Sequence, residues 1–262
     1  MNDPFPAIAE ASATGETADL FADIRSTVGV RVVNLVWRHL ATLDGALPWA
    51  WAAVKPLYLD GLPDQAARRF RETMAIPKLA SLAGDAPASV DAVLASYDHS
   101  NTINLFALGA LVAWLRGEAV GSAPSGGARL PAPDVTLPPL ASEADVSPET
   151  WALVQRLNRF GDRPQPLILA SMYRHLAHAP AFLQHVEQAL APAQADGELD
   201  RAIAANRAAA HQTAKQLAQV ISAERPALAG KIEAGVSGFV DHAIGKMVTI
   251  CRAIRVARGN AL

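Results

Sequence analysis

The chain has little that would commit it to redox, membrane or nucleic-acid chemistry. Its 262 residues include one cysteine, Cys251, which excludes an intrachain disulfide and any Cys-x-x-Cys motif. The longest apolar run, Leu105 to Leu115, is shorter than the about 20 residues that span a bilayer, so we expect a buried helix and no membrane partner. A net charge of −2 argues against a nucleic-acid partner. The N-terminus lacks the features of a secretory signal, so we expect a cytoplasmic protein.

A short pattern occurs twice in the chain. Residues Trp37–Ala41 (WRHLA) return as Tyr173–Ala177 (YRHLA) after 136 residues, and Asp98-His99 returns as Asp241-His242 after 143. The common order and similar spacing predict an internal duplication. Neighbouring repeats commonly need each other to cover their apolar faces, and pockets favour the interface between them. We therefore predict a fused pseudo-dimer of two repeats, related by a pseudo-twofold axis, with a pocket between them.

The spacing of hydrophobic residues predicts helices in both halves of the chain. Hydrophobic residues make up 51% of the chain, and no segment alternates long enough to form a sheet, which predicts an all-α fold. Between Gly117 and Pro148 the chain holds six prolines and three further glycines, a composition typical of a linker. The predicted organisation is a loose tail (1–17), a helical repeat (18–117), a Pro/Gly-rich linker (118–148) and a second helical repeat (149–262). The sequence leaves homodimer formation open.

Polar residues at the start of an apolar helix are candidates for a site. Asp98 and Asn101 are three residues apart, so we expect them on one face, where they either cap and satisfy the helix or face a polar cavity. Arg38 and Arg174 are candidates for anchoring an anionic ligand, with an ion pair between helices as the alternative. The repeated histidines lack the spacing of a helical metal motif, so no metal or cofactor is expected.

Several stretches resemble a known enzyme family. Residues 36–51 (VWRHLATLDGALPWAW) and 97–111 (YDHSNTINLFALGAL), with Ala170-Ser171 and the Leu190-Ala191-Pro192 ending, are similar to the group I (D,L-) 2-haloacid dehalogenases, or halocarboxylic acid dehydrogenase family. The similarity covers most of the chain without a signature motif. It implies an all-helical fused pair of repeats. It also implies hydrolysis in which an aspartate activates a water that displaces halide from C2, without a cofactor or covalent ester.

The resemblance also assigns site residues. Asn101 matches an active-site asparagine, and Ser171 a retained position of the active-site segment. The next position, where the family has the water-activating aspartate, is Met172, and methionine cannot deprotonate a water. Val32 and Leu35 stand where the family tends to have bulky rings, so we expect these two residues and Met172 to line an altered substrate pocket.

Whether the protein is an enzyme is therefore left open. One hypothesis is a dehalogenase-like hydrolase acting on a small carboxylic acid, with Asp98, Asp241 or Asp162 as a relocated carboxylate. The other is a noncatalytic helical protein that binds a small ligand between the repeats. A redox-active peroxidase on a related helical scaffold needs two nearby cysteines and is excluded. Both hypotheses require Asn101 and Ser171 to face one cavity.

Overall fold

The computed structural model describes residues 6–161 and 168–260, and these residues contain helices and no strand. The all-α fold class is thereby confirmed. The α-helices are α1 (Gly15–Val28), α2 (Leu35–Leu40), α3 (Ala46–Leu59), α4 (Leu62–Thr73), α5 (Ala88–Arg116), α6 (Pro148–Leu157), α7 (Ser171–Leu176), α8 (Pro180–Ala195), α9 (Glu198–Leu217), α10 (Ala229–Gly238) and α11 (Gly245–Ala257). A π-helix, Phe239–Ile244, joins α10 to α11, and short 3₁₀ turns lie at Glu10–Ser12, Glu143–Asp145 and Ala218–Val220.

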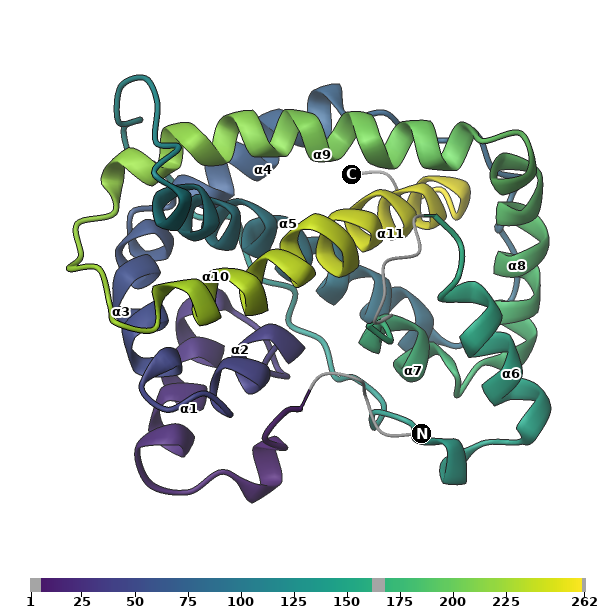
Figure 1. Ribbon diagram of the computed structural model, residues 1–262. Coiled ribbons are helices and arrows are strands. Elements are labelled where there is room, and N and C mark those ends of the chain that lie inside the picture. Colours follow the sequence, from purple (N-terminus) through teal and green to yellow (C-terminus); the bar gives the residue numbers. More distant parts are fainter. Residues whose placement is uncertain (1–5, 162–167, 261–262) are drawn as a thin grey trace.

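Helix α5 runs through the middle of the molecule. It is apolar on all sides over its second half, and 22 of its 29 residues are buried, as expected for a helix surrounded by others. The rod formed by α10, the π-helix and α11 crosses it, and α9 extends along one side of both (Figure 1). Helices α1–α3 lie at one end and α6–α8 at the other. None of the described helices combines the length and hydropathy needed to cross a bilayer.

The hydrophobic core consists of two clusters, and each draws on both halves of the chain. The first joins α1–α4 and the second half of α5 to the end of α9, α10 and the π-helix. The second joins the first half of α5 to α6–α8, the start of α9 and α11. The halves therefore share their cores, and α5 belongs to both clusters.

Several local features occur at matching positions in the two halves. Helices α3 and α8 each contain an internal proline, Pro56 and Pro192, which are 136 residues apart. Each of these helices is followed by an Asp-Gly pair whose glycine, Gly61 or Gly197, has positive φ and precedes the next helix. The two glycines are again 136 residues apart.

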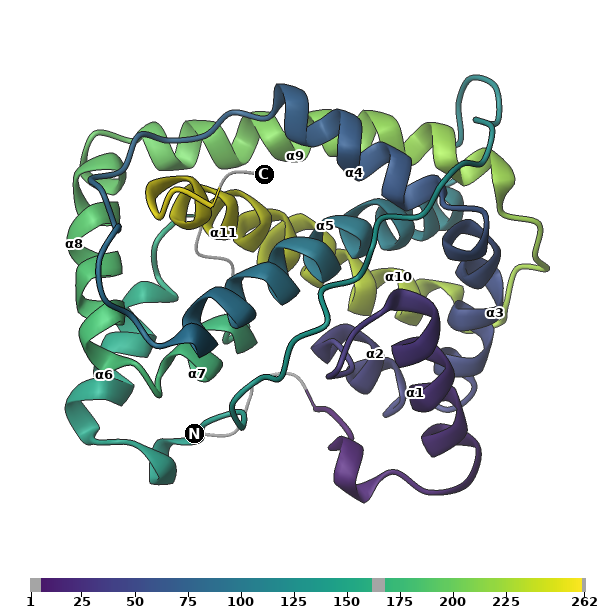
Figure 2. The same cartoon turned by 180° about the vertical axis from the view of Figure 1, so that it is seen from behind.

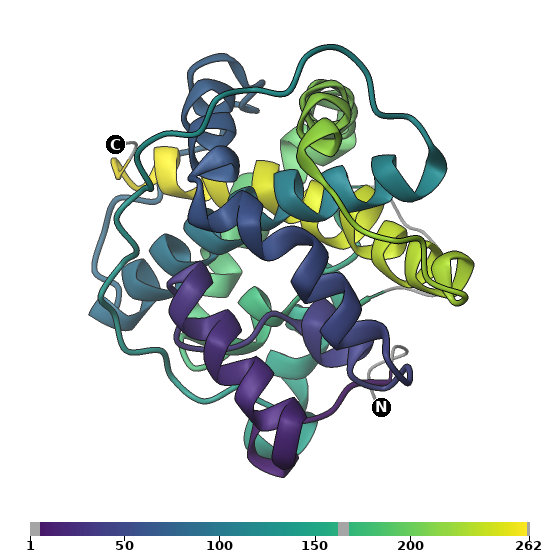
Figure 3. The ribbon, with the colours of Figure 1, turned by 90° about the vertical axis from the view of Figure 1, so that its left-hand side faces the viewer.

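Residues 118–142, here called the strap, form no helix and cross the outside of the molecule from α5 to the turn before α6 (Figures 2 and 3). The strap is held along its length. The Leu130 N–H donates to Asp64 Oδ1 at 2.7 Å, and the Gly127 N–H to the Asp60 carbonyl at 2.9 Å. Gly61 has φ of +66° and a Cβ placed there would lie 2.2 Å from the Gly127 carbonyl oxygen, so this close approach requires glycine.

The described part of segment 1–17, which we expected to be a loose tail, contains helical residues. Helix α1 begins at Gly15 rather than at residue 18, and a 3₁₀ turn precedes it at Glu10–Ser12. The Ile8 N–H donates to the Arg38 carbonyl at 3.0 Å, which holds this segment against α2. The hydrogen bond to α2 therefore holds this segment in place, although the composition of the segment predicted a loose tail.

Candidate functional site

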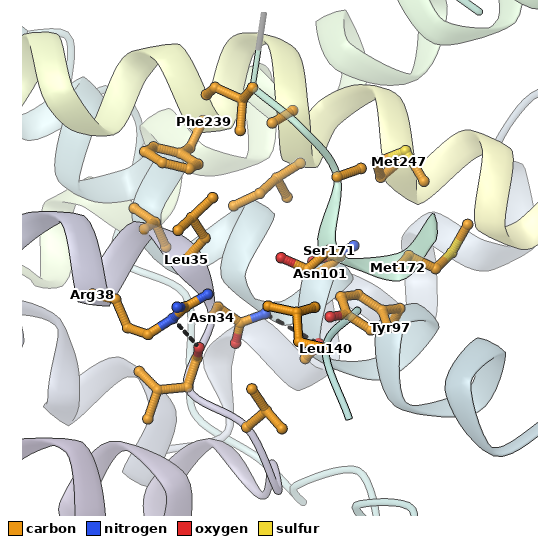
Figure 4. Close-up of a pocket in the computed structure, with 18 of the residues that line it drawn as sticks. Asn34, Leu35, Arg38, Tyr97, Asn101, Leu140, Ser171, Met172, Phe239 and Met247 are labelled. Atoms are coloured by element: carbon orange, nitrogen blue, oxygen red, sulfur yellow. Dashed lines mark hydrogen bonds between the residues drawn. The ribbon is translucent and has the colours of Figure 1, made fainter. Parts of the chain in front are cut away.

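A cavity of about 60 Å³ lies where α2 and α7 approach the middle of α5 (Figure 4). The strap, the π-helix and the start of α11 complete its walls. Its volume suits a ligand of a few heavy atoms. We call it the central pocket, and it is lined by Val32, Val33, Asn34, Leu35, Val36, Arg38, Ser96, Tyr97, Ser100, Asn101, Leu137, Leu140, Ile168, Leu169, Ala170, Ser171, Met172, Phe239, Ala243, Ile244 and Met247.

One wall of the central pocket is polar because α5 presents a stripe of polar residues to it. Tyr97, Ser100 and Asn101 have helical spacing and all line the pocket. The Asn34 Nδ2 donates to Ser100 Oγ at 3.4 Å, and the Asn34 Oδ1 accepts from Asn104 Nδ2 at 3.0 Å. Within the described part of the chain the Asn101 side chain makes no hydrogen bond although it is buried, so its carboxamide is available to a ligand.

Tyr97 and Ser171 connect α5 to α7. Burial raises the pKa of the Tyr97 phenol well above its usual range, while the nearby Ser171 side chain and the positive charges of Arg38 and Arg174 oppose that shift. The phenol is therefore neutral at physiological pH and can donate a hydrogen bond. It is not a base for deprotonating water at that pH.

The opposite wall is apolar. Phe239, Ala243 and Ile244 come from the π-helix, and Met247 from α11. Leu35 adds to this wall from α2, and Figure 4 shows it close to Phe239 and across the pocket from Tyr97. A π-helix is rare and is found frequently at functional sites.

The structure brings together six of the eight residues singled out from the sequence. They all line the central pocket: Val32, Leu35, Arg38, Asn101, Ser171 and Met172. The requirement that Asn101 and Ser171 face one cavity is met. Their chemical roles stay predictions. Asp98 and Arg174 are absent from the lining.

Asp98 does not share the pocket face with Asn101, contrary to the expectation from their spacing. Its side chain is 4% exposed and pairs with Arg255 at 2.5 Å and with Arg71 and Arg252 at 3.5 Å each. Helix α5 is buried on all sides, so two residues three apart can serve different neighbours. Asp98 is turned to the arginines of α4 and α11 instead of the pocket.

The other proposed carboxylates are not in the pocket either. Asp241 lies 2.9 Å from His211 Nε2 and 3.7 Å from Arg116, and it does not line the cavity. Asp162 lies outside the described residues. The pocket lining contains no Asp, Glu or His among the described residues, so no side chain there is an evident general base for water.

The two repeated arginines occupy related but unequal places. Arg38 lines the pocket, and its Nε donates to the Val33 carbonyl at 3.1 Å. Arg174 Nε donates to the Ala141 carbonyl of the strap at 2.7 Å. Both contribute positive charge at Tyr97. Arg38 is the pocket's one cationic side chain among the described lining residues.

The repeated histidines hold chain segments in place. His39 Nδ1 bonds the Pro6 carbonyl at 2.8 Å, and His175 Nδ1 bonds the Pro138 carbonyl at 2.7 Å. A carbonyl accepts only, so each Nδ1 carries a proton. Burial lowers the pKa of His175 to about 4, which keeps it neutral. The His175 contact holds Pro138 of the strap, next to Leu137, and both Leu137 and Leu140 line the pocket.

Asn158 supports the pocket and was missed by the sequence analysis. Its Nδ2 donates to the Ile168 carbonyl at 3.0 Å, and its Oδ1 accepts from the Ala170 N–H at 3.0 Å. These bonds fix the extended segment that leads into Ser171. No local signal marks this residue, because a buried asparagine at the end of α6 resembles any helix-terminal asparagine.

Comparisons with known proteins identify solved structures with a similar fold. Neither a family model nor a curated protein sequence matches the chain. Solved structures match over its whole length. A D-2-haloacid dehalogenase mutant in complex with D-2-CPA has a TM-score of 0.73 at 15% identity, covering 100% of this chain and 97% of that chain. A D-2-haloacid dehalogenase mutant has 0.74 at 16%, and a D-2-haloacid dehalogenase with L-LA has 0.75 at 16%, both with the same coverage. The protein therefore has a haloacid-dehalogenase-like fold.

Proposed function

We propose that the protein binds a small 2-substituted carboxylic acid in the central pocket, and that it does not hydrolyse carbon-halogen bonds by activating a water. The observation that carries the proposal is the composition of the lining: one arginine and several neutral polar groups, with Met172 where the family resemblance expects an aspartate. An anion is attracted to such a site, but a water in it finds no base.

Because one wall of the central pocket is polar and the opposite wall is apolar, the pocket suits a ligand with one polar and one apolar end. Arg38, Tyr97 and Asn101 offer a cation and neutral donors to a carboxylate. Leu35, Phe239 and the other apolar residues suit a short alkyl or halogen substituent on the neighbouring carbon. The cavity of about 60 Å³ limits the ligand to a small acid. The fold shared with D-2-haloacid dehalogenases favours the same chemical class.

A catalytic role for Asp98 finds no support in its surroundings. A general base needs a free lone pair within reach of the water, and the Asp98 carboxylate is engaged by three arginines outside the pocket lining. We therefore do not favour the hydrolase with a relocated carboxylate.

We further propose that the pocket lies on the pseudo-twofold axis of a duplicated chain. The pocket residues Leu35 and Ser171 are 136 residues apart, as are Val36 and Met172. On the long helices, Asn101 and Ile244 are 143 apart, the spacing of the repeated Asp-His pair. In this view α5 of the first repeat supplies most of the polar wall, the π-helix and α11 of the second repeat supply most of the apolar wall, and the paired short helices α2 and α7 contribute to both.

Titration calorimetry with D- and L-2-chloropropionate and L-lactate tests the proposed binding. We expect saturable binding that weakens by about tenfold or more in Arg38→Gln, since a hydrogen bond to a charged group contributes about 1.5–3 kcal/mol. Arg156→Gln is the matched control, because Arg156 is exposed and pairs with Glu187 on the surface of α6 and α8. Absence of binding by all three acids, or equal binding by Arg38→Gln, contradicts the proposal.

A further inference from the structure

A series of buried hydrogen bonds runs through the core and ends at the central pocket. The Tyr58 hydroxyl donates to Asn104 Oδ1 at 2.6 Å, and Asn104 Nδ2 donates to Asn34 Oδ1 at 3.0 Å. Asn34 Nδ2 in turn donates to Ser100 Oγ at 3.4 Å, the bond drawn from Asn34 in Figure 4. Tyr58 belongs to α3, Asn34 precedes α2, and the other two residues lie one turn apart on α5. We call these four residues the polar chain.

The direction of the polar chain is fixed at its Tyr58 end. Tyr58 is 1% exposed, and within the described part of the protein its hydroxyl bonds Asn104 and no other residue. Because a buried hydroxyl without a partner for its hydrogen is unfavourable, Tyr58 donates to the Asn104 oxygen. The Asn104 amide then offers its nitrogen to Asn34, and the Asn34 amide offers its nitrogen to Ser100. Every bond in the chain therefore donates toward the pocket.

Ser100, at the end of the polar chain, has a hydrogen left to donate. Its Oγ accepts from Asn34, and a serine hydroxyl carries one hydrogen. A serine or threonine in a helix can donate to the carbonyl four residues earlier, as Thr102 does to Asp98 at 2.6 Å. Ser100 makes no such bond to any of the described residues, although it is 3% exposed, and it lines the central pocket. Its hydrogen is therefore available to a molecule in the pocket.

We propose that Ser100 donates a hydrogen bond to the carboxylate of the bound acid, and that Tyr58 positions this donor through the two asparagines. The inference rests on the proposed function, because it takes the ligand of the central pocket to be a small acid. Carboxylate oxygens only accept hydrogen bonds, which matches the donor that the polar chain provides beside the positive charge of Arg38. Hydrogen bonds that point the same way polarise one another, which strengthens the last donor. Tyr58 does not line the pocket, so it acts as a positioning residue.

Titration calorimetry of Ser100→Ala with D- and L-2-chloropropionate and L-lactate tests the donor. We expect the variant to bind about tenfold more weakly than the unmodified protein, the loss of one hydrogen bond to a charged group. If the acids bind and Arg38→Gln weakens binding but a folded Ser100→Ala does not, this inference is wrong while the proposed function stands. If none of the three acids binds the unmodified protein, the proposed function fails and this inference fails with it.

A double-mutant cycle on the same Kd values tests the positioning role of Tyr58. Tyr58→Phe should weaken binding about threefold, because the hydroxyl that directs the polar chain is lost. In the Ser100→Ala background the same substitution should have no further effect, since Tyr58 acts through Ser100.

Tyr173→Phe is the matched control for Tyr58→Phe. Tyr173 is equally buried, at 0% exposed, and its hydroxyl bonds none of the described residues, so its removal should leave the Kd unchanged. Thermal unfolding shows whether each variant is folded. The positioning role is overturned by a folded Tyr58→Phe variant that binds as tightly as the unmodified protein, or by an equal effect of Tyr58→Phe with and without the Ser100 hydroxyl.

Discussion

At the scale of single residues, two buried asparagines of α5 illustrate the difference between a structural and an available polar group. Asn104 Oδ1 accepts from the Tyr58 hydroxyl at 2.6 Å and its Nδ2 donates to Asn34, so both ends are used. Asn101 is also buried, but it lines the pocket and none of the described residues bonds its side chain. Both asparagines lie in the family-like stretch, and only the structure distinguishes them.

We therefore expect opposite effects from the same substitution at these positions. Asn104→Ala should lower the free energy of unfolding by about 1–3 kcal/mol, because it leaves buried partners unsatisfied. Asn101→Ala should change stability little and weaken binding of a small carboxylate by about tenfold, the loss of one hydrogen bond to a charged group. Urea denaturation and titration calorimetry on both variants measure this. The assignment of Asn101 to the ligand is contradicted if only stability changes.

His175 gives the protein a specific sensitivity to acid. Its ring is 2% exposed and burial lowers its pKa from 6.5 to about 4. Between these values the unfolded state takes up a proton and the folded state does not, so the free energy of unfolding falls as the pH falls from about 6.5 to 4. The full effect of such a shift is about 3 kcal/mol.

The variant His175→Asn isolates this contribution. Its amide replaces the Nδ1–H donor to Pro138 but cannot titrate. Between pH 7 and 4.5 the variant should lose less stability than the unmodified protein in urea denaturation. An unchanged loss would assign the acid sensitivity to other groups, such as His99, whose pKa burial also lowers.

At the scale of elements, the sequence predicted that the chain is helical and missed how some of the helices join. The all-α class follows from periodicity, and the repeated motif WRHLA/YRHLA forms two short helices at the pocket as α2 and α7. Asn101 and Ser171 were placed at one cavity by the family resemblance and by nothing in composition. The π-helix was not predicted, because a sequence pattern does not separate it from the flanking α-helices.

The face of α5 that meets the pocket also required the structure. The stretch from Ser96 to Asn104 is polar on more than one side, so periodicity alone could not decide between Asp98 and Tyr97 as the residue facing Ser171. The choice depends on the arginines of α4 and α11, which are distant in sequence and attract Asp98 to the other side.

The segment before α7 should depend on Asn158 for its position. Asn158→Ala leaves the Ile168 carbonyl and the Ala170 N–H without their partner, so we expect a loss of about 1–3 kcal/mol in the free energy of unfolding. Weaker carboxylate binding should accompany it, since Ser171 follows directly. In contrast to Arg38→Gln, both stability and binding should change. Unaltered stability would argue that Asn158 does not fix this segment.

At the scale of the whole molecule, the two halves depend on each other. Each core cluster takes residues from both, and α5 contributes to both clusters. We therefore expect residues 1–117 and 149–262, produced separately, to lack cooperative thermal unfolding and near-ultraviolet circular dichroism, because each exposes half of two cores. Cooperative unfolding of either fragment alone would contradict this dependence and indicate an autonomous domain.

The central claim is that a pocket without a carboxylate binds a small acid but does not hydrolyse it. Chloride release from D- and L-2-chloropropionate, measured for the unmodified protein, Met172→Asp and the control Met172→Leu, tests this claim most directly. We predict no chloride above a heat-denatured sample from the unmodified protein and Met172→Leu, and measurable chloride from Met172→Asp, which places a carboxylate in the pocket wall. Sustained chloride release by the unmodified protein that Asn101→Ala abolishes would contradict the account.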